Sequence, residues 1–316
     1  MTDGNNEPNW ERDVLEKLAT DALVEQRRKR RWSIFFRLLT FIYVGVILWM
    51  LNDFGDGSPA KLTDGKHTAL VQLNGVIGPK AEASAENINL ALQSAFEAKG
   101  AQGVVLLINS PGGSPVQAGL INDEIRRLRA KHPNTPIYAV VEDLCASGGY
   151  YVAAAADKIF VDKASILGSI GVLMEGFGFT GTMEKLGVER RLLTAGENKG
   201  FLDPFSPQEP KHLEHARTLL ADVHKQFIDV VRKGRGNRLK ETTDTFSGLM
   251  WTGEQSVENG LADSLGSVDF VAREVIKAED VRDYTRKTHF AERLARQLGA
   301  ASGETLLSFL SQVRLR

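Results

Sequence analysis

The stretch GVVLLINSPGG at residues 103–113 joins a run of aliphatic residues to a turn built from proline and glycine. The amphipathic pattern VQAGLINDEIRRLRAKH follows at residues 116–132. A buried strand, a tight turn and a helix in this order are typical of a βαβ unit. Apolar runs alternate with helical patterns from His67 onward, so the sequence predicts an α/β domain with a mainly parallel sheet.

A second junction between a strand and a helix lies in VEDLCASGGYYV, residues 141–152. The apolar residues before it predict a strand, and the small residues after Ser147 predict a buried helix. Ser147 is then either a small residue that lets the helix begin close to the sheet, or a nucleophile. The residues of this segment alone leave both interpretations open.

The glycine turn INSPGG, residues 108–113, has three possible functions. Its backbone N–H groups at a helix N-terminus can hold a phosphate, line an oxyanion hole, or simply close a tight turn. The turn lacks the lysine of a P-loop and the full glycine pattern of a dinucleotide site. N–H groups of Gly113 and Gly148 would supply two donors from two turns, which is the arrangement that stabilises a tetrahedral oxyanion.

A catalytic serine needs a base that accepts its proton. The histidines are found in predicted helices, helix ends or the tail, or precede the first strand, and we expect all of them at the surface: His67, His132, His212, His215, His224 and His289. A lysine can replace histidine if burial lowers the lysine pKa. Lys199 lies in AGENKGFLDPF, residues 195–205, which on sequence alone predicts an exposed turn.

Composition excludes several classes of function. The 316 residues carry a net charge of -1, which gives no electrostatic support for binding nucleic acid. The single cysteine, Cys145, excludes an intramolecular disulfide, and no Cys and His residues have the spacing of a zinc site. We therefore expect neither a metal nor a cofactor.

The N-terminal region has the pattern of a membrane anchor. Five basic residues at 27–31 precede WSIFFRLLTFIYVGVILWML, residues 32–51, which is long enough to cross a bilayer as a helix. The positive-inside rule predicts that residues 1–31 stay in the cytoplasm and that the remainder lies outside, on the periplasmic side of the inner membrane. A cleaved signal peptide or a buried core helix fits less well, because the polar lead-in is long and no A-x-A site follows.

Four segments occur in an order that resembles one protease family. They are INSPGG, CASGGYYVAAAADKI at residues 145–159, ILGSIGV at residues 166–172, and the turn that contains Lys199. Together they resemble the signal peptide peptidase A family, in its single-length form. The resemblance implies a ClpP/crotonase-like α/β spiral of βαβ units and a serine endopeptidase that acts through an acyl-enzyme.

The resemblance also implies a role for each site residue. Ser147 would be the nucleophile, Lys199 the general base, and Ser169 the hydroxyl that orients Lys199. The N–H groups of Gly113 and Gly148 would form the oxyanion hole. Remnant signal peptides or other apolar peptides would be the substrates, and the protein would be a homo-oligomer.

These inferences predict five consecutive regions. They are a cytoplasmic basic segment at 1–31, a transmembrane helix at 32–51, a linker at 52–66, an extracytoplasmic Ser/Lys peptidase domain at 67–275, and a tail at 276–316. Within the domain, residues 183–196 predict a helix followed by a strand. Residues 206–236 predict a long amphipathic helix.

Three alternatives remain at this point. A ClpP-type Ser/His/Asp protease needs a histidine soon after the serine helix, and residues 157–185 contain none. A crotonase-type acyl-processing protein would use the two glycine turns without Ser147 or Lys199. A catalytically idle membrane scaffold would keep the fold alone, although the presence of Ser147, Ser169 and Lys199 together argues against it.

Overall fold

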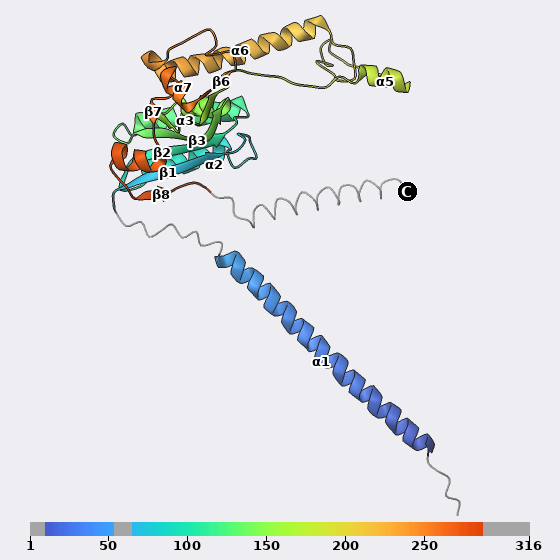
Figure 1. Cartoon of the computed structure of the whole chain (residues 1–316). Helices are drawn as coiled ribbons and strands as arrows, with labels where there is room; N and C mark the ends of the chain where they lie inside the picture. The colour runs from blue at the N-terminus through green and yellow to red at the C-terminus, as the bar shows by residue number, and fades with distance from the viewer. Residues whose placement is uncertain (1–9, 54–64, 287–316) are drawn as a thin grey trace, which may run out of the picture. The chain divides into compact units, whose positions relative to one another are not determined.

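The computed structural model describes residues 10–53 and 65–286 of the chain (Figure 1). The chain divides into two compact units, and the second unit covers Thr63–Lys287. The described part of the first unit is one helix, α1 (Trp10–Asp53). The ends of the predicted regions at 1–31, 52–66 and 276–316 fall partly on residues 1–9, 54–64 and 287–316, which lie outside the described residues.

The helix α1 contains the segment that we predicted as an anchor at residues 32–51. At the first residue of that segment, the ring of Trp32 stacks on Phe36 and meets Phe35 edge-on. Within the described residues, no helix combines the length and the apolar character that crossing a membrane requires.

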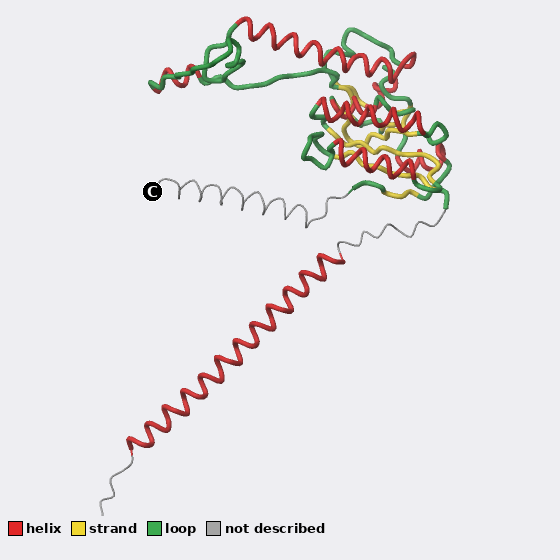
Figure 2. The backbone as a smooth tube through the Cα atoms, turned by 180° about the vertical axis from the view of Figure 1, so that it is seen from behind, coloured by secondary structure: helices red, strands yellow, loops and turns green. Residues whose placement is uncertain are grey.

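The second unit is a mixed α/β fold built on one sheet of eight strands (Figures 1 and 2). The strands are β1 (His67–Asn74), β2 (Ala101–Ser110), β3 (Ile137–Ala146), β4 (Lys158–Val161), β5 (Ile166–Gly168), β6 (Met250–Thr252), β7 (Ser264–Leu265) and β8 (Val281–Asp283). The main path runs β6-β5-β3-β2-β1-β8, and β4 bridges β3 to β7. Only the β5–β6 pair is antiparallel among the pairs of the described sheet. The predicted parallel α/β domain is therefore confirmed.

Helices cover both faces of this sheet. The helices of the unit are α2 (Ala85–Glu97), α3 (Pro115–Lys131), α4 (Gly148–Ala153), α5 (Thr180–Leu186), α6 (Pro210–Arg235), α7 (Gly253–Glu258) and α8 (Val268–Phe270), with short helical turns at Gly236–Arg238 and Val271–Ile276, and α5 lies away from the sheet. Alternate residues of β2 point to opposite sides, as a pleated strand requires. Leu106 packs in the larger core with α2 and α3, whereas Val105 packs in a smaller core with Val271.

The strand β3 pairs with two different neighbours along its length. Its first half, from Tyr138 to Val141, pairs with β4, and its end, from Leu144 to Ala146, pairs with β5. The two neighbours diverge where Glu142 and Asp143 lie exposed. This division opens the sheet at the carboxyl end of β3, where ligands bind in many parallel α/β sheets.

A projecting arm leaves the sheet after β5 and returns through α6. It comprises residues 172–209, with α5 in its middle, and in both views it lies at the end of α6 that is remote from the sheet (Figures 1 and 2). The strand that we predicted within residues 183–196 does not form, because Val188 and Leu193 are exposed and no described strand lies alongside. The predicted long helix is confirmed as α6.

The other end of α6 is fixed by a buried ion pair. The Arg235 side chain is 1% exposed, and its Nη1 lies 2.7 Å from Oδ2 of Asp263. Arg235 Nε also donates to the carbonyl of Gly260, and Arg238 Nη1 lies 3.0 Å from the second carboxylate oxygen of Asp263. This cluster joins the helix to the turn that follows α7.

The sheet continues past residue 275, where we predicted that the domain ends. The strand β8 pairs in parallel with β1, through Thr68 and Val281, Ala69 and Arg282, and Leu70 and Asp283. β8 has three residues, and its one apolar side chain is partly buried. This segment is too short for its hydrophobic pattern to predict a strand. The compact unit therefore reaches Lys287.

Candidate active site

Ser147 occupies a strained position between β3 and α4. Its backbone angles are φ 51° and ψ -122°, a conformation that residues other than glycine rarely adopt. Its N–H donates to the carbonyl of Gly168 at 2.8 Å, and its carbonyl accepts from Tyr151 at 3.0 Å. Such strain costs about 1–3 kcal/mol and clusters at functional sites. A serine on a sharp, strained turn from strand to helix is also the geometry of a nucleophile elbow.

Ser169 lies beside Ser147 because β5 pairs with the end of β3. Ala146 is opposite Gly168 in the register, so the two serines follow paired residues on parallel strands. Ser169 also has a positive φ, of 52°, and its N–H donates to the carbonyl of Leu249 at 2.7 Å. Both hydroxyl side chains line one groove. The structure therefore brings together two of the predicted site residues.

The glycine turn after β2 lies directly against Ser147. Ser110 pairs with Cys145, which places residues 111–113 beside the start of α4. A Cβ atom on Gly112 would lie 2.6 Å from the nitrogen of Gly148, and one on Gly113 would lie 2.1 Å from the carbonyl oxygen of Ile77. Both approaches are too close for any side chain, so this packing requires glycine.

The N–H groups of Gly113 and Gly148 are adjacent and available. A Cβ atom built on Gly148 would lie 3.3 Å from the nitrogen of Gly113. Within the described part of the chain, neither N–H group donates to another protein group. Two free backbone donors next to a strained serine match the predicted oxyanion hole.

Replacing Gly113 with alanine should disrupt this turn. The φ of Gly113 is +146°, and the new Cβ would collide with Ile77, so we expect the N–H to be displaced. Loss of one oxyanion donor typically lowers kcat by about a hundredfold or more. The measurement is kcat/KM for an apolar peptide, with the melting temperature recorded in parallel. Gly181→Ala on α5 is the control, because nothing lies within 4 Å of its Cβ position. Unchanged hydrolysis by Gly113→Ala would rule out this donor.

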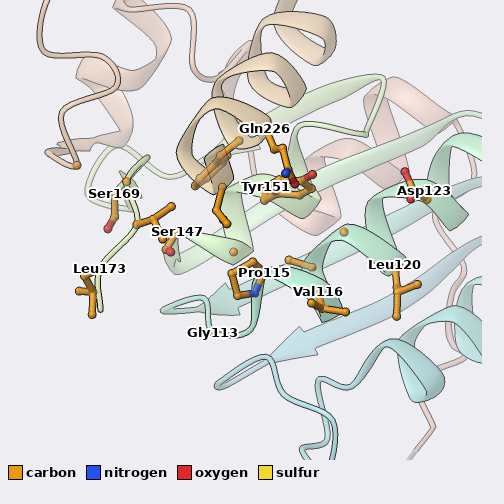
Figure 3. Close-up of a pocket in the computed structure, with 18 of the residues that line it drawn as sticks. Gly113, Pro115, Val116, Leu120, Asp123, Ser147, Tyr151, Ser169, Leu173 and Gln226 are labelled. Carbon is orange, nitrogen blue, oxygen red and sulfur yellow. The ribbon is translucent and has the colours of Figure 1, made fainter. Parts of the chain in front are cut away.

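The groove around Ser147 has a volume of about 800 Å³ and is mostly apolar (Figure 3). Its walls come from the glycine turn, α3, α4, α6 and the segments that follow β5 and precede β6. They comprise Gly113, Pro115, Val116, Ala118, Gly119, Leu120, Asp123, Ser147, Gly148, Tyr151, Ser169, Gly171, Val172, Leu173, Val223, Gln226, Phe227, Ser247 and Gly248. Asp123 is the only charged residue among these described residues.

Lys199 does not line this groove. It is exposed on the turn at the remote end of α6, and the neighbouring Glu197 forms an ion pair with Lys211 at 2.7 Å. Val223, the first residue of α6 that lines the groove, is 12 residues further along the same helix than Lys211. At 1.5 Å per residue this separation is about 18 Å, beyond the reach of one lysine side chain. Within a single chain, the two members of the predicted dyad are therefore apart.

The turn that carries Lys199 is packed against the start of α6. The ring of Phe201 lies edge-on to His212 and His215, with ring centroids 5.3 Å and 5.7 Å away. The burial of His212, with 7% of its surface exposed, contradicts our expectation that all histidines lie at the surface. His67 is also fully buried, because it stacks on Tyr284 and its Nε2 lies 2.9 Å from the Tyr284 hydroxyl oxygen.

The thiol of Cys145 does not compete with Ser147 as a nucleophile. Cys145, two residues before Ser147, is buried, and burial raises the pKa of its thiol, which keeps it protonated. Among the described His, Cys, Asp and Glu side chains, no group of three or more is arranged to hold a metal ion. Ser147 is thus the nucleophile candidate in this groove.

Sequence reasoning missed the residues that shape the groove. Val116, Leu120 and Asp123 recur at helical spacing along one face of α3, and this periodicity was the available signal. The contribution of Phe227 had no signal in the sequence, because it depends on the tertiary packing of α6, in which Phe227 contacts Tyr151.

The comparisons with known proteins agree with this site. Residues 129–282 match a family described as Peptidase family S49. An Enterococcus faecium protein named "Putative signal peptide peptidase SppA" is 30% identical over 257 residues, covering 78% of this chain and 73% of that protein. The chain belongs to peptidase family S49. The predicted resemblance to the signal peptide peptidase A family is confirmed, and S49 membership places the chain in a family of serine peptidases.

Other relatives are much longer than the part that matches. Protease 4 of Haemophilus influenzae is 28% identical over 224 residues, covering 70% of the S49 chain and 35% of that protein. A Brucella abortus protein named Na⁺/H⁺ antiporter NhaA is 41% identical over 225 residues, covering 70% of the S49 chain and 29% of that protein. The chain thus spans less than a third of the Brucella abortus protein, and the similarity is limited to that matched part.

Proposed function

We propose that this protein is a membrane-anchored serine endopeptidase in which Ser147 forms an acyl-enzyme. The observation that carries the proposal is the strained backbone of Ser147 next to two free N–H groups, from Gly113 and Gly148. Family membership supports the same reaction.

The geometry supports a standard sequence of acyl transfer. Ser147 Oγ attacks the carbonyl carbon of the scissile bond, and its proton passes to a base. The developing oxyanion accepts hydrogen bonds from Gly113 and Gly148, and the proton then moves to the leaving amine. Water, activated by the same base, hydrolyses the ester and restores Ser147.

Among the described residues, a single chain places no general base for Ser147 in its own groove. Of the described residues that line the groove, none is a lysine or a histidine, and the Asp123 carboxylate lies at the far end. We infer that Lys199 of a neighbouring copy reaches Ser147 in a homo-oligomer, with Ser169 placed to accept a hydrogen bond from its ammonium or amine. Exposed apolar side chains on the arm support such a contact, among them Phe177, with 82% of its surface exposed, and Leu193, with 97%.

The remaining proposals concern substrate, topology and architecture. The apolar walls of the groove favour apolar peptides, such as remnant signal peptides, as substrates. Residues 32–51 would anchor the chain in the cytoplasmic membrane, with residues 1–31 inside and the peptidase domain on the periplasmic side. The helices on both faces of the parallel sheet fit a ClpP/crotonase-like spiral.

Mixing two inactive variants tests the shared site. Full chains with Ser147→Ala and with Lys199→Ala should each lose nearly all hydrolysis of an apolar peptide. Their co-expressed mixture should regain about a quarter of wild-type activity, because random head-to-tail assembly pairs an intact Ser147 with an intact Lys199 at about one contact in four. The measurement is the initial rate at equal total protein, with co-assembly verified by two affinity tags.

The control mixture combines Ser147→Ala with the double variant Ser147→Ala/Lys199→Ala, which should stay inactive. Full activity of Lys199→Ala alone would eliminate the dyad. Absence of recovery in a verified mixed oligomer would eliminate the shared site. A wild-type protein without peptidase activity would favour the idle scaffold, and hydrolysis by Ser147→Ala would favour an acyl-processing site that uses only the glycine turns.

A further inference from the structure

Among the described residues that line the groove, Asp123 is the charged one, and it lies at the end away from Ser147. Figure 3 shows the labelled residues running from Leu173 and Ser169, past Ser147, to Leu120 and Asp123. The exposed side chains of Val116 and Leu120 form an apolar wall along this path. An extended peptide in the groove would therefore pass apolar side chains first and then meet a carboxylate.

The Asp123 carboxylate has no partner among the described residues. It forms no hydrogen bond or ion pair, whereas the next acidic residue on α3, Glu124, is paired with Arg127 at 2.7 Å. Arg126 lies one turn further along, but its Nε donates to Asn122 at 2.8 Å and its side chain does not line the groove. Asp123 is thus free to bind a cation that enters the groove.

The charge of Asp123 acts on another residue of the groove wall. Tyr151 lines the same wall, and burial raises the pKa of its hydroxyl above the ordinary value of 10.0. The negative charge of Asp123 adds to this rise, while Arg126 opposes it. The positive charge of Arg126 reduces the attraction that Asp123 exerts on a ligand but does not cancel it by forming a pair.

The length of α3 sets where a cation would bind. Pro115, two residues after the oxyanion donor Gly113, is eight residues before Asp123, which corresponds to about 12 Å along the helix. An extended peptide advances about 3.3 Å per residue. For an extended peptide that runs parallel to α3 from the glycine turn, this length corresponds to three or four residues from the scissile carbonyl.

We propose that Asp123 selects peptides that carry a lysine or arginine three or four residues from the scissile bond, within an otherwise apolar segment. The proposal rests on the proposed peptidase function and names its substrate class more closely. A segment of this kind occurs where an apolar membrane-spanning stretch meets its basic flank. Asp123 acts here as a specificity-determining residue and takes no part in the bond-breaking steps.

Peptide binding to the full chain with Ser147→Ala tests the proposal without consuming the peptide. An apolar octapeptide is changed at one position at a time to lysine, norleucine or glutamate, and Kd is measured by fluorescence anisotropy. We expect lysine to bind about threefold more tightly than norleucine at one or two adjacent positions, the scale of a solvent-exposed charge pair. The preference for lysine should shrink in about 1 M salt, because the Debye length is then about 3 Å and the charge pair is screened.

Three variants in the Ser147→Ala background identify the group responsible. Asp123→Asn should abolish the lysine preference, and Asp123→Lys should reverse it in favour of glutamate. Asp222→Asn on α6 should keep the preference, because it removes the same charge from a residue outside the groove lining. Mass spectrometry of wild-type digests should place lysine three or four residues from the cleaved bond.

Equal binding of the three peptides would overturn the proposal, as would a lysine preference that survives Asp123→Asn. A preferred lysine at another spacing from the cleaved bond would also overturn it. Because binding is measured without the nucleophile, these outcomes are separate from failure of the peptidase function. That failure would appear as wild-type protein leaving every peptide intact.

Discussion

Ser147→Ala should abolish peptide hydrolysis while leaving the fold intact. Removal of a serine nucleophile lowers kcat by several orders of magnitude in serine peptidases, and we expect a loss of at least about a thousandfold. We expect the fold to persist because the hydrogen bonds of Ser147 to Gly168 and Tyr151 are made by its backbone and do not need the hydroxyl. The measurement is kcat/KM for an apolar peptide, together with trapping of the acyl-enzyme by a serine-directed phosphonate.

The matched control is Ser94→Ala on α2, whose exposed hydroxyl donates only to the carbonyl of Leu90 at 2.9 Å. This variant should keep both hydrolysis and labelling. Phosphonate labelling that persists in Ser147→Ala would assign the nucleophile to another residue. Loss of activity in Ser94→Ala would show that the assay reports stability and not chemistry.

Asp263→Asn should produce the largest loss of stability. The substitution leaves the buried guanidinium of Arg235 without its counter-charge, and removing one partner of a buried pair typically costs about 3–5 kcal/mol. Residual interaction of Arg235 with the Gly260 carbonyl offsets only part of this cost. Thermal unfolding followed by circular dichroism should show a clearly lower melting temperature. Glu97→Gln is the control and should change the melting temperature little, since its ion pair with Lys131 is exposed on both sides.

The same pair predicts how stability depends on pH. Burial tends to raise the pKa of Asp263, but the hydrogen bond and charge of Arg235 outweigh burial and hold the pKa below its ordinary value of 3.8. A lowered folded-state pKa contributes stability that is complete above 3.8 and declines as the pH falls below it. The melting temperatures of wild type and Asp263→Asn should therefore converge in strong acid. A constant difference down to pH 2 would contradict this assignment.

The α/β class and much of the site could be predicted because they depend on local patterns. Strands and helices alternate with clear periodicity, and glycines mark the turn at 108–113 and the helix start after Ser147. The sequence placed Gly113, Gly148 and Ser147 in one site, and the register of β2, β3 and β5 explains why they meet with Ser169.

The rest depends on contacts that no local pattern encodes. The position of Lys199 relative to Ser147 follows from the straight course of α6, which carries the arm away from the sheet. The burial of His67 follows from its contact with Tyr284, more than two hundred residues later in the chain. The sequence alone identifies Asp123 only as a polar residue on the surface of a helix. The packing of α6 over α4 makes that surface a wall of the groove.

The pairing of β8 with β1 has a consequence for the order in which the chain folds during synthesis. The strands β1, β2 and β3 and their connecting helices are made early and can pair as soon as they emerge. β1 carries the buried apolar side chains of Ala69, Val71 and Leu73, and its edge stays open until residues 281–283 are made. An apolar edge strand is a template for pairing with other chains. A nascent or truncated chain that ends before β8 would therefore leave this edge of β1 unpaired and open to pairing with other chains, and the last strand of the sheet protects the first.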